Sequence, residues 1–151
     1  MELLPLIPLS ILVYTDYKEK MISIFPLISF IAIQIFLAIW LFGINILIER
    51  VLFNLFILLM LSFGVYIYCK LRRLKVFEMT GLGDILFIIG LAPMFDTKKF
   101  LLFLIISLLI SLLYWLANFV LRKDNIVPLV TTIGFSYGIY LIFMFLEHEY
   151  I

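Results

Sequence analysis

The sequence has very little of the chemistry on which many enzymes depend: among 151 residues there is one cysteine, Cys69, and one histidine, His148. Disulfide frameworks, zinc fingers, haem sites, Cys/His nucleophile pairs and Ser-His-Asp triads all need these residue types in combination. Counting alone therefore argues against each of these classes. Any chemistry must come from carboxylates, hydroxyls, Lys or Arg side chains, or the backbone.

Charge is also scarce. Only 14% of the residues are charged, against about 25% in a soluble domain, and 66% are hydrophobic, against roughly 45–50%. Eleven Lys and Arg against ten Asp and Glu leave a net charge of +1, which provides neither a basic field for nucleic acid nor an acidic tail. The composition excludes a soluble protein and predicts the lipid bilayer, not nucleic acid, as its partner.

What the sequence does have is a series of long apolar stretches, and a helix needs about 20 such residues to cross ~30 Å of hydrocarbon. The stretches are 3–15, 21–48, 51–69, 79–95, 100–121 and 125–146. The second is longer than one crossing, so its helix is expected to end near Phe42 and Gly43, with the remainder along the outer interface. The prediction is an all-α integral membrane protein with six transmembrane helices in a single membrane-embedded domain, residues 1–151.

The first stretch could also be read as a signal peptide. It has no basic region before it, and Pro5 and Pro8 lie inside its apolar part, so we expect a retained short helix. Strands are not expected, because the runs lack the alternation of a membrane barrel.

The distribution of basic residues predicts the orientation. Eight of the eleven fall in the first, third and fifth connections: Lys18, Lys20, Lys70, Arg72, Arg73, Lys75, Arg122 and Lys123. Since cytoplasmic loops are enriched in Lys and Arg, these connections are expected to be cytoplasmic and both termini outside, in the cell's inner (cytoplasmic) membrane with multiple passes. Asp16 and Asp84 then both lie at the cytoplasmic face.

Asp84 is the stronger candidate of the two aspartates. It lies in an apolar segment with no cation within a turn, and an ionisable group there costs ~2.5–3.5 kcal/mol and is a functional candidate by default. Asp16 begins a polar connection and could also be a solvated helix cap. Two carboxylates within hydrogen-bond reach would share one proton, and such a pair supports general acid–base catalysis without a covalent intermediate.

Gly81 and Gly83 directly precede Asp84. Each glycine costs about 1 kcal/mol in a helix, but glycine allows a sharp turn or the close approach of another segment. The alternatives are a helix start with small-residue packing and, less well supported because no strand precedes it, a glycine-rich phosphate loop.

With these residues the chain resembles the type IV prepilin leader peptidases among the Gly-x-Gly-Asp intramembrane aspartic proteases. Residues 78–84 match the family pattern Glu-x-x-Gly-x-Gly-Asp. Residues 16–22 keep the aspartate, the basic spacer and the isoleucine of a second pattern, but Ser23 and Ile24 replace Pro-Asn. Leu86 stands where the family usually has lysine, and residues 126–128 with Gly134 loosely match a third landmark.

The resemblance implies an aspartic endopeptidase that removes the short basic leader of a prepilin-like precursor, just before the precursor's hydrophobic helix. It implies Asp16 and Asp84 as catalytic residues, supported by Gly81 and Gly83, with no metal and no cofactor. Leader lysines could be contacted by Glu19, Glu78 and Asp124. The length and the lone cysteine imply a short form without the methyltransferase domain of larger members.

Two other classes stay open. A small transporter or channel component could use the aspartates to carry ions or protons, and a catalytically silent scaffold could serve pilus assembly. A leader-cleavage assay separates the peptidase from both.

Overall fold

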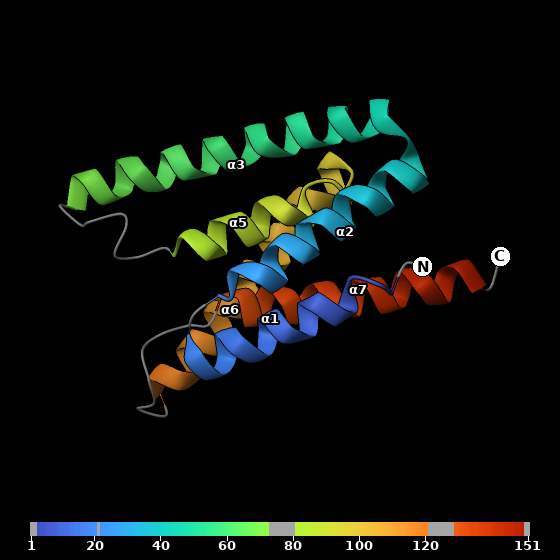
Figure 1. Ribbon diagram of the computed structural model, residues 1–151. Helices are drawn as coiled ribbons and strands as arrows, with labels where there is room; N and C mark the ends of the chain where they lie inside the picture. The colour runs from blue at the N-terminus through green and yellow to red at the C-terminus, as the bar shows by residue number, and fades with distance from the viewer. Residues whose placement is uncertain (1–2, 21, 73–80, 121–128, 150–151) are drawn as a thin grey trace.

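A computed structural model describes residues 3–20, 22–72, 81–120 and 129–149, and all regular secondary structure in these ranges is helical. The helices are α1 (Leu6–Glu19), α2 (Ile24–Phe42), α3 (Ile44–Arg72), α5 (Leu82–Leu91), α6 (Thr97–Val120) and α7 (Leu129–Glu149). Consecutive helices run in alternate directions, so both ends of the chain lie at the same end of the bundle (Figure 1). The all-helical prediction is confirmed.

Three of the helices are long and apolar enough to cross a membrane: α2, α3 and residues 97–118 of α6. They indicate a membrane protein. Helix α5 has only 10 residues, which at 1.5 Å per residue is about 15 Å, half the hydrocarbon thickness. The six helices are thus unequal in length, and α5 cannot cross a bilayer by itself.

The connection between α2 and α3 corrects one expectation. The second helix ends at Phe42 as predicted, with Gly43 at φ 80° after it, a conformation that glycine adopts readily. Residues 44–48 do not form a separate interfacial segment, because α3 begins at Ile44 and continues for 29 residues. One glycine reverses the chain, and the guanidinium of Arg50 lies 3.9 Å from the centre of the Phe42 ring, which accommodates the charge near the turn.

The apolar stretch 79–95 also differs from a single helix. Helix α5 ends at Leu91, and the following turn is buried from Ala92 to Phe95. The side-chain amide of Asn54 in α3 donates hydrogen bonds of 2.9 Å to the carbonyls of both Ala92 and Phe95. Because buried carbonyls need partners, this asparagine allows an irregular turn where composition alone suggests more helix.

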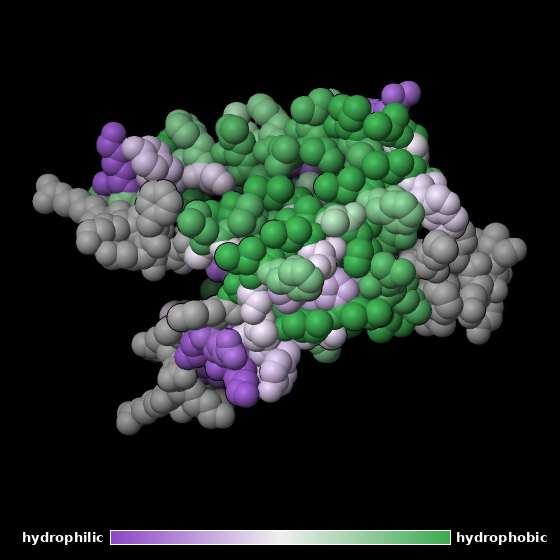
Figure 2. Space-filling view, in the orientation of Figure 1, coloured by the Kyte–Doolittle hydropathy of each residue, from purple (hydrophilic) through white to green (hydrophobic). Residues whose placement is uncertain are grey.

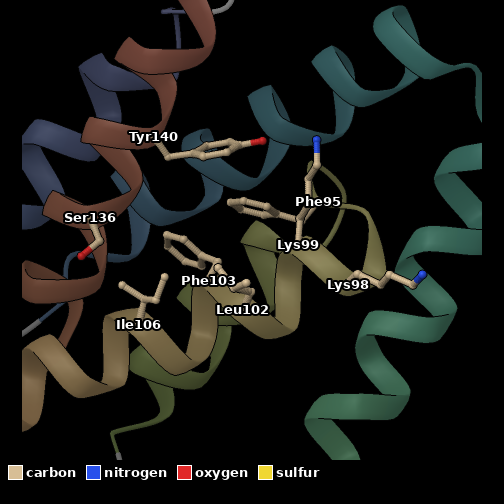
Figure 3. Close-up of a pocket in the computed structure, with 8 residues that line it drawn as sticks. All are labelled: Phe95, Lys98, Lys99, Leu102, Phe103, Ile106, Ser136 and Tyr140. Atoms are coloured by element: carbon tan, nitrogen blue, oxygen red, sulfur yellow. The ribbon is translucent and has the colours of Figure 1, made fainter.

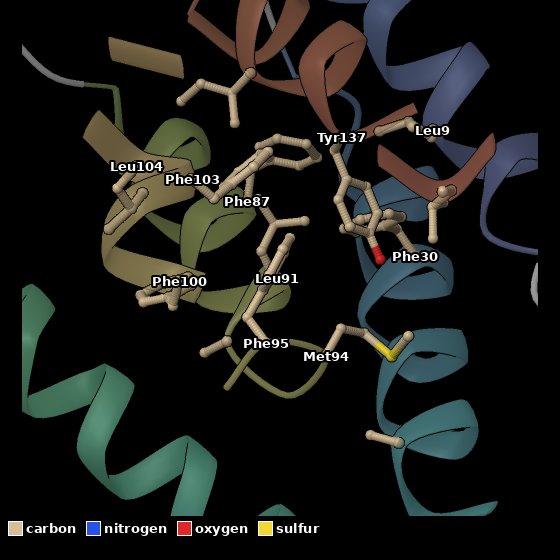
Figure 4. Close-up of a cluster of buried hydrophobic side chains, with 14 of the residues drawn as sticks. Leu9, Phe30, Phe87, Leu91, Met94, Phe95, Phe100, Phe103, Leu104 and Tyr137 are labelled. Atoms are coloured by element: carbon tan, nitrogen blue, oxygen red, sulfur yellow. The ribbon is translucent and has the colours of Figure 1, made fainter. Parts of the chain in front are cut away.

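An aromatic cluster joins α2, α5, α6 and α7 in the core (Figure 4). Phe30 stacks on Phe87 with ring centres 5.3 Å apart, and Phe95 stacks on Phe103 at 4.8 Å. Tyr137 lies between these pairs and is fully buried, with its ring 6.0 Å from that of Phe30. Aromatic pairs at these distances add about 0.5–1.5 kcal/mol beyond the area they bury.

Two pairs of buried polar side chains link helices within this core. The Gln34 side chain donates a 2.7 Å hydrogen bond to the Tyr137 hydroxyl and so links α2 to α7. Hydroxyls of Ser111 and Thr132 pair in the same way between α6 and α7. Buried polar groups without partners would be costly, so these bonds fix how the helices meet.

The surface is apolar over the middle of the bundle and hydrophilic at its ends (Figure 2). Helix α3 is the extreme case: it packs on α2 and α6, and of its side chains only Leu47, Asn54 and Cys69 are buried. An apolar surface this extensive would aggregate in water, whereas lipid can cover it.

Candidate functional site

Asp16 lies in the last turn of α1, and its side chain is only 5% exposed. Its Oδ2 atom accepts two hydrogen bonds from Thr131, one of 2.7 Å from the backbone N–H and one of 2.8 Å from the hydroxyl. Thr131 lies in the first turn of α7, where backbone N–H groups have no acceptor within the helix. The aspartate therefore meets the N-terminus of a helix 115 positions away, which is favourable for a negative charge.

Asp84 lies in the first turn of α5 and is partly buried. Its carboxyl accepts a hydrogen bond from the backbone of Gly81, and it interacts electrostatically with Asp16. Two like charges that close disfavour simultaneous ionisation. The fold thus brings together two carboxyls that are 68 positions apart in the sequence.

Both glycines before Asp84 contribute to this arrangement. A Cβ atom at Gly81 would lie 3.2 Å from Oδ2 of Asp84, and a Cβ atom at Gly83 would lie 2.6 Å from Cδ1 of Ile22. The second distance is a clash, so only glycine at position 83 lets α5 approach the connection between α1 and α2. Of the two roles expected for these glycines, a sharp turn or the close approach of another segment, the structure shows close approach at Gly83; at Gly81 a Cβ atom would crowd the Asp84 carboxyl.

The remaining predicted site residues divide between described and undescribed parts. Glu19 is exposed, three residues after Asp16 at the end of α1. Leu86 is 47% exposed, two residues after Asp84. Glu78, Asp124 and the motif at 126–128 lie outside the described residues. Gly134 is described, and a Cβ atom there would lie 2.8 Å from Cγ2 of Val13, so this glycine lets α7 approach α1 closely.

Sequence reasoning missed Thr131. A threonine near the start of an apolar stretch is a common helix-start residue, and position 131 follows Pro128 by three residues, so a helix N-terminus here was foreseeable. Its partner was not, because nothing local in the sequence says which buried carboxylate a helix start will meet.

An apolar groove of about 340 Å³ opens between α6 and α7, at the end of the bundle away from the aspartates (Figure 3). It is lined by Phe95, Lys98, Lys99, Leu102, Phe103, Ile106, Ser136 and Tyr140. Its lining contains no carboxylate. The paired aspartates are therefore a separate site, formed where the ends of α1, α5 and α7 meet.

No protein-family model matches the chain, and comparison with curated proteins and with solved structures gives no match either. The candidate function rests on the site itself and on the motif resemblance.

Proposed function

We propose that the protein is an aspartic endopeptidase that removes the short basic leader of prepilin-like precursors at the cytoplasmic face of the membrane. The observation that carries the proposal is the pairing of Asp16 and Asp84, which interact electrostatically at one end of an apolar helix bundle. The glycines of the Gly-x-Gly-Asp sequence support the proposal, because a Cβ atom at Gly81 would crowd the Asp84 carboxyl and one at Gly83 would clash with Ile22.

In the proposed mechanism the two carboxyls share one proton. The ionised member takes a proton from a bound water, which attacks the scissile carbonyl, while the protonated member polarises the carbonyl oxygen. The C–N bond of the resulting tetrahedral intermediate then breaks, the leaving amine receives the proton taken from water, and the pair returns to its starting state. Water supplies the nucleophile, so the mechanism requires no metal and no cofactor.

The proposed orientation places the aspartates on the cytoplasmic side, with both termini outside and six helices within the membrane. Lys18 and Lys20 follow Asp16, and Lys70 and Arg72 end α3. All four belong to the end of the bundle that holds the aspartates (Figure 1). This is the enrichment that marks a cytoplasmic face.

The proposed substrate is a precursor with a basic leader followed by a hydrophobic helix. Such a helix would lie in the bilayer beside the bundle and present the segment before it at the depth of Asp16 and Asp84. Glu19 is exposed at the end of α1, where it could attract leader lysines; Glu78 and Asp124 are proposed for the same role from the sequence. From the resemblance to the short members of the family and from the single cysteine, the protein is proposed to cleave without methylating its product.

A cleavage assay tests this function. The purified protein in detergent or lipid is incubated with a precursor that carries a basic leader and a hydrophobic helix, and the products are identified by mass spectrometry. We expect one cut just before the hydrophobic helix, lost when either aspartate is replaced by asparagine. Absence of cleavage across a panel of precursors would reject the peptidase.

A small transporter or channel component is the second candidate. The observation that favours it is the set of buried polar pairs, Gln34 with Tyr137 and Ser111 with Thr132, inside an apolar bundle, since such groups can mark an ion or proton path. Proton or ion flux into vesicles containing the protein, without cleavage of any precursor, would favour this candidate.

A further inference from the structure

One residue of α7 saturates one oxygen of the Asp16 carboxyl. Oδ2 accepts hydrogen bonds from both the N–H and the hydroxyl of Thr131, at 2.7 and 2.8 Å. A carboxylate oxygen has two lone-pair positions, so Oδ2 has none left for a proton. A proton on Asp16 must therefore sit on Oδ1.

Within the described ranges, the hydroxyl of Thr131 has one other acceptor, the backbone carbonyl of Val13 in α1, at 3.4 Å. A hydroxyl carries a single hydrogen, and the Asp16 contact is shorter by more than half an ångström. Bonds to a charged acceptor are also stronger. The hydroxyl hydrogen thus belongs to Asp16.

We propose that Thr131 is a positioning residue for the aspartate pair, and that it leaves Oδ1 of Asp16 as the only oxygen of this carboxyl that exchanges a proton. The inference rests on the proposed function and deepens it, because it names the residue that orients one of the two acids. A carboxyl fixed by two donors cannot rotate, so the reacting oxygen keeps its direction through each catalytic cycle.

Among the described residues, Thr131 is the one that donates side-chain and backbone hydrogen bonds to the Asp16 carboxyl, and the charged groups near it are as follows. From α5 comes Asp84, and α1 itself contributes Lys18, Glu19 and Lys20, all exposed. Helix α2 contains no charged residue. In the described part of α7 up to position 143, the titratable side chains are Tyr137 and Tyr140, six or more residues beyond Thr131.

Replacing Thr131 by valine removes the hydroxyl but keeps the backbone N–H and nearly the same volume. The Asp16 carboxyl then loses one of two donors and gains freedom to rotate. We expect kcat to fall about tenfold, as for the loss of a hydrogen bond to a charged group, with KM little changed. The pH profile of kcat should also change, because the hydroxyl no longer holds the reacting oxygen in one direction.

Two variants make the comparison specific. Thr131→Ser restores the hydroxyl and should recover kcat to within about twofold of wild type and the original pH profile, as a bond carried by the hydroxyl requires. Thr132→Val makes the same substitution one position later, where the hydroxyl pairs with Ser111 instead. This variant also loses a buried hydroxyl, so it reproduces the cost in stability, but its kcat and pH profile should stay as in wild type. If the valine variant does not accumulate in the membrane, Thr131→Ala takes its place.

A wild-type rate and pH profile in Thr131→Val, or a serine variant that fails to recover, would overturn the proposal. A readout independent of cleavage separates it from the proposed function: the titration of the Asp16 carboxyl carbon by nuclear magnetic resonance, assigned by its loss in Asp16→Asn. A titration that moves in Thr131→Val and stays in Thr132→Val supports the positioning role even if wild type cleaves nothing, in which case only the peptidase is rejected. A titration that does not move rejects the positioning role whatever the cleavage result.

Discussion

At the scale of single residues, the contact between Gly83 and Ile22 determines how α5 reaches the end of α1. A Cβ atom at position 83 would lie 2.6 Å from Cδ1 of Ile22 and 2.9 Å from its Cβ. The second atom belongs to the stem of the side chain, which cannot move without the backbone. A methyl group here must therefore push α5, and Asp84 with it, away from Ile22 and so change the position of Asp84 relative to the end of α1.

We accordingly expect Gly83→Ala to destabilise the protein by about 1–3 kcal/mol, the usual cost of overpacking, and to reduce cleavage strongly. Thermal unfolding in detergent measures the first effect and the precursor assay the second. The matched control is Gly64→Ala in α3, where an added Cβ meets nothing within 4 Å. Equal behaviour of the two variants would contradict a steric role for Gly83.

The aspartates provide the second prediction at this scale. Asp16→Asn and Asp84→Asn should each lose nearly all cleavage, and the double variant should be little worse than either single one, because residues that act as a unit are not additive. Asparagine keeps size and polarity, so the amount of protein in the membrane should be unchanged, as membrane immunoblots can check.

The rate of wild-type cleavage should depend on pH in two titration steps, and each step should belong to the pair of carboxyls, not to one aspartate. Substantial cleavage by either single variant, at equal protein level, would rule out the shared-proton mechanism and bring the transporter candidate forward.

The part of the site that could be predicted from sequence is the part marked by patterns of neighbouring residues. Asp84 was identifiable because a carboxylate in an apolar segment is costly and two glycines precede it. Asp16 was identifiable because the basic residues beside it predict the same side of the membrane as for Asp84. Thr131 was not, because its contact joins positions 115 apart and depends on the angle at which α7 packs on α1, a property of the folded bundle.

At the scale of helices, Asn54 links α3 to the turn after α5. Asn54→Ala should leave the carbonyls of Ala92 and Phe95 without their side-chain donor, and a buried unpaired polar group costs about 1–3 kcal/mol. We expect a lower unfolding temperature in detergent. Asn45→Ala, at an exposed position of the same helix, is the control and should unfold as wild type; a matching drop there would show that the turn bonds are not the cause.

The sequence predicts the end of α2 but not the end of α5. Gly43 indicates the end of α2, because glycine adopts a positive φ readily. The residues after Leu91 are apolar and compatible with helix, so composition cannot distinguish the buried turn from another helical turn. Asn54 of α3 satisfies the buried carbonyls of Ala92 and Phe95 and so allows α5 to end there, and such a partner is visible only in three dimensions.

At the scale of the whole molecule, the alternate directions of the helices place both termini at one end, and the proposed orientation puts that end outside. A reporter that is active only outside the cytoplasm, fused after residue 151, should therefore be active, and one fused in the connection after Arg72 should not. Labelling of single added cysteines by an impermeant reagent gives an independent check. A cytoplasmic C-terminus would put both aspartates on the wrong face and reject leader cleavage.

Helix α3 has a consequence for how the protein responds to its surroundings. Its 29 residues include a charge-free stretch of 19, from Val51 to Cys69, which extends about 28 Å and so matches the ~30 Å of an average hydrocarbon layer. In a thinner bilayer the helix must lean or the lipid around it must stretch. Any lean is passed through Asn54 to the turn that ends α5, and so to the helix that carries Asp84. For the proposed peptidase we therefore expect the rate to depend on bilayer thickness: reconstitution in lipids of graded acyl-chain length should give a rate optimum, with shorter chains tilting α3 and changing the position of Asp84 relative to Asp16.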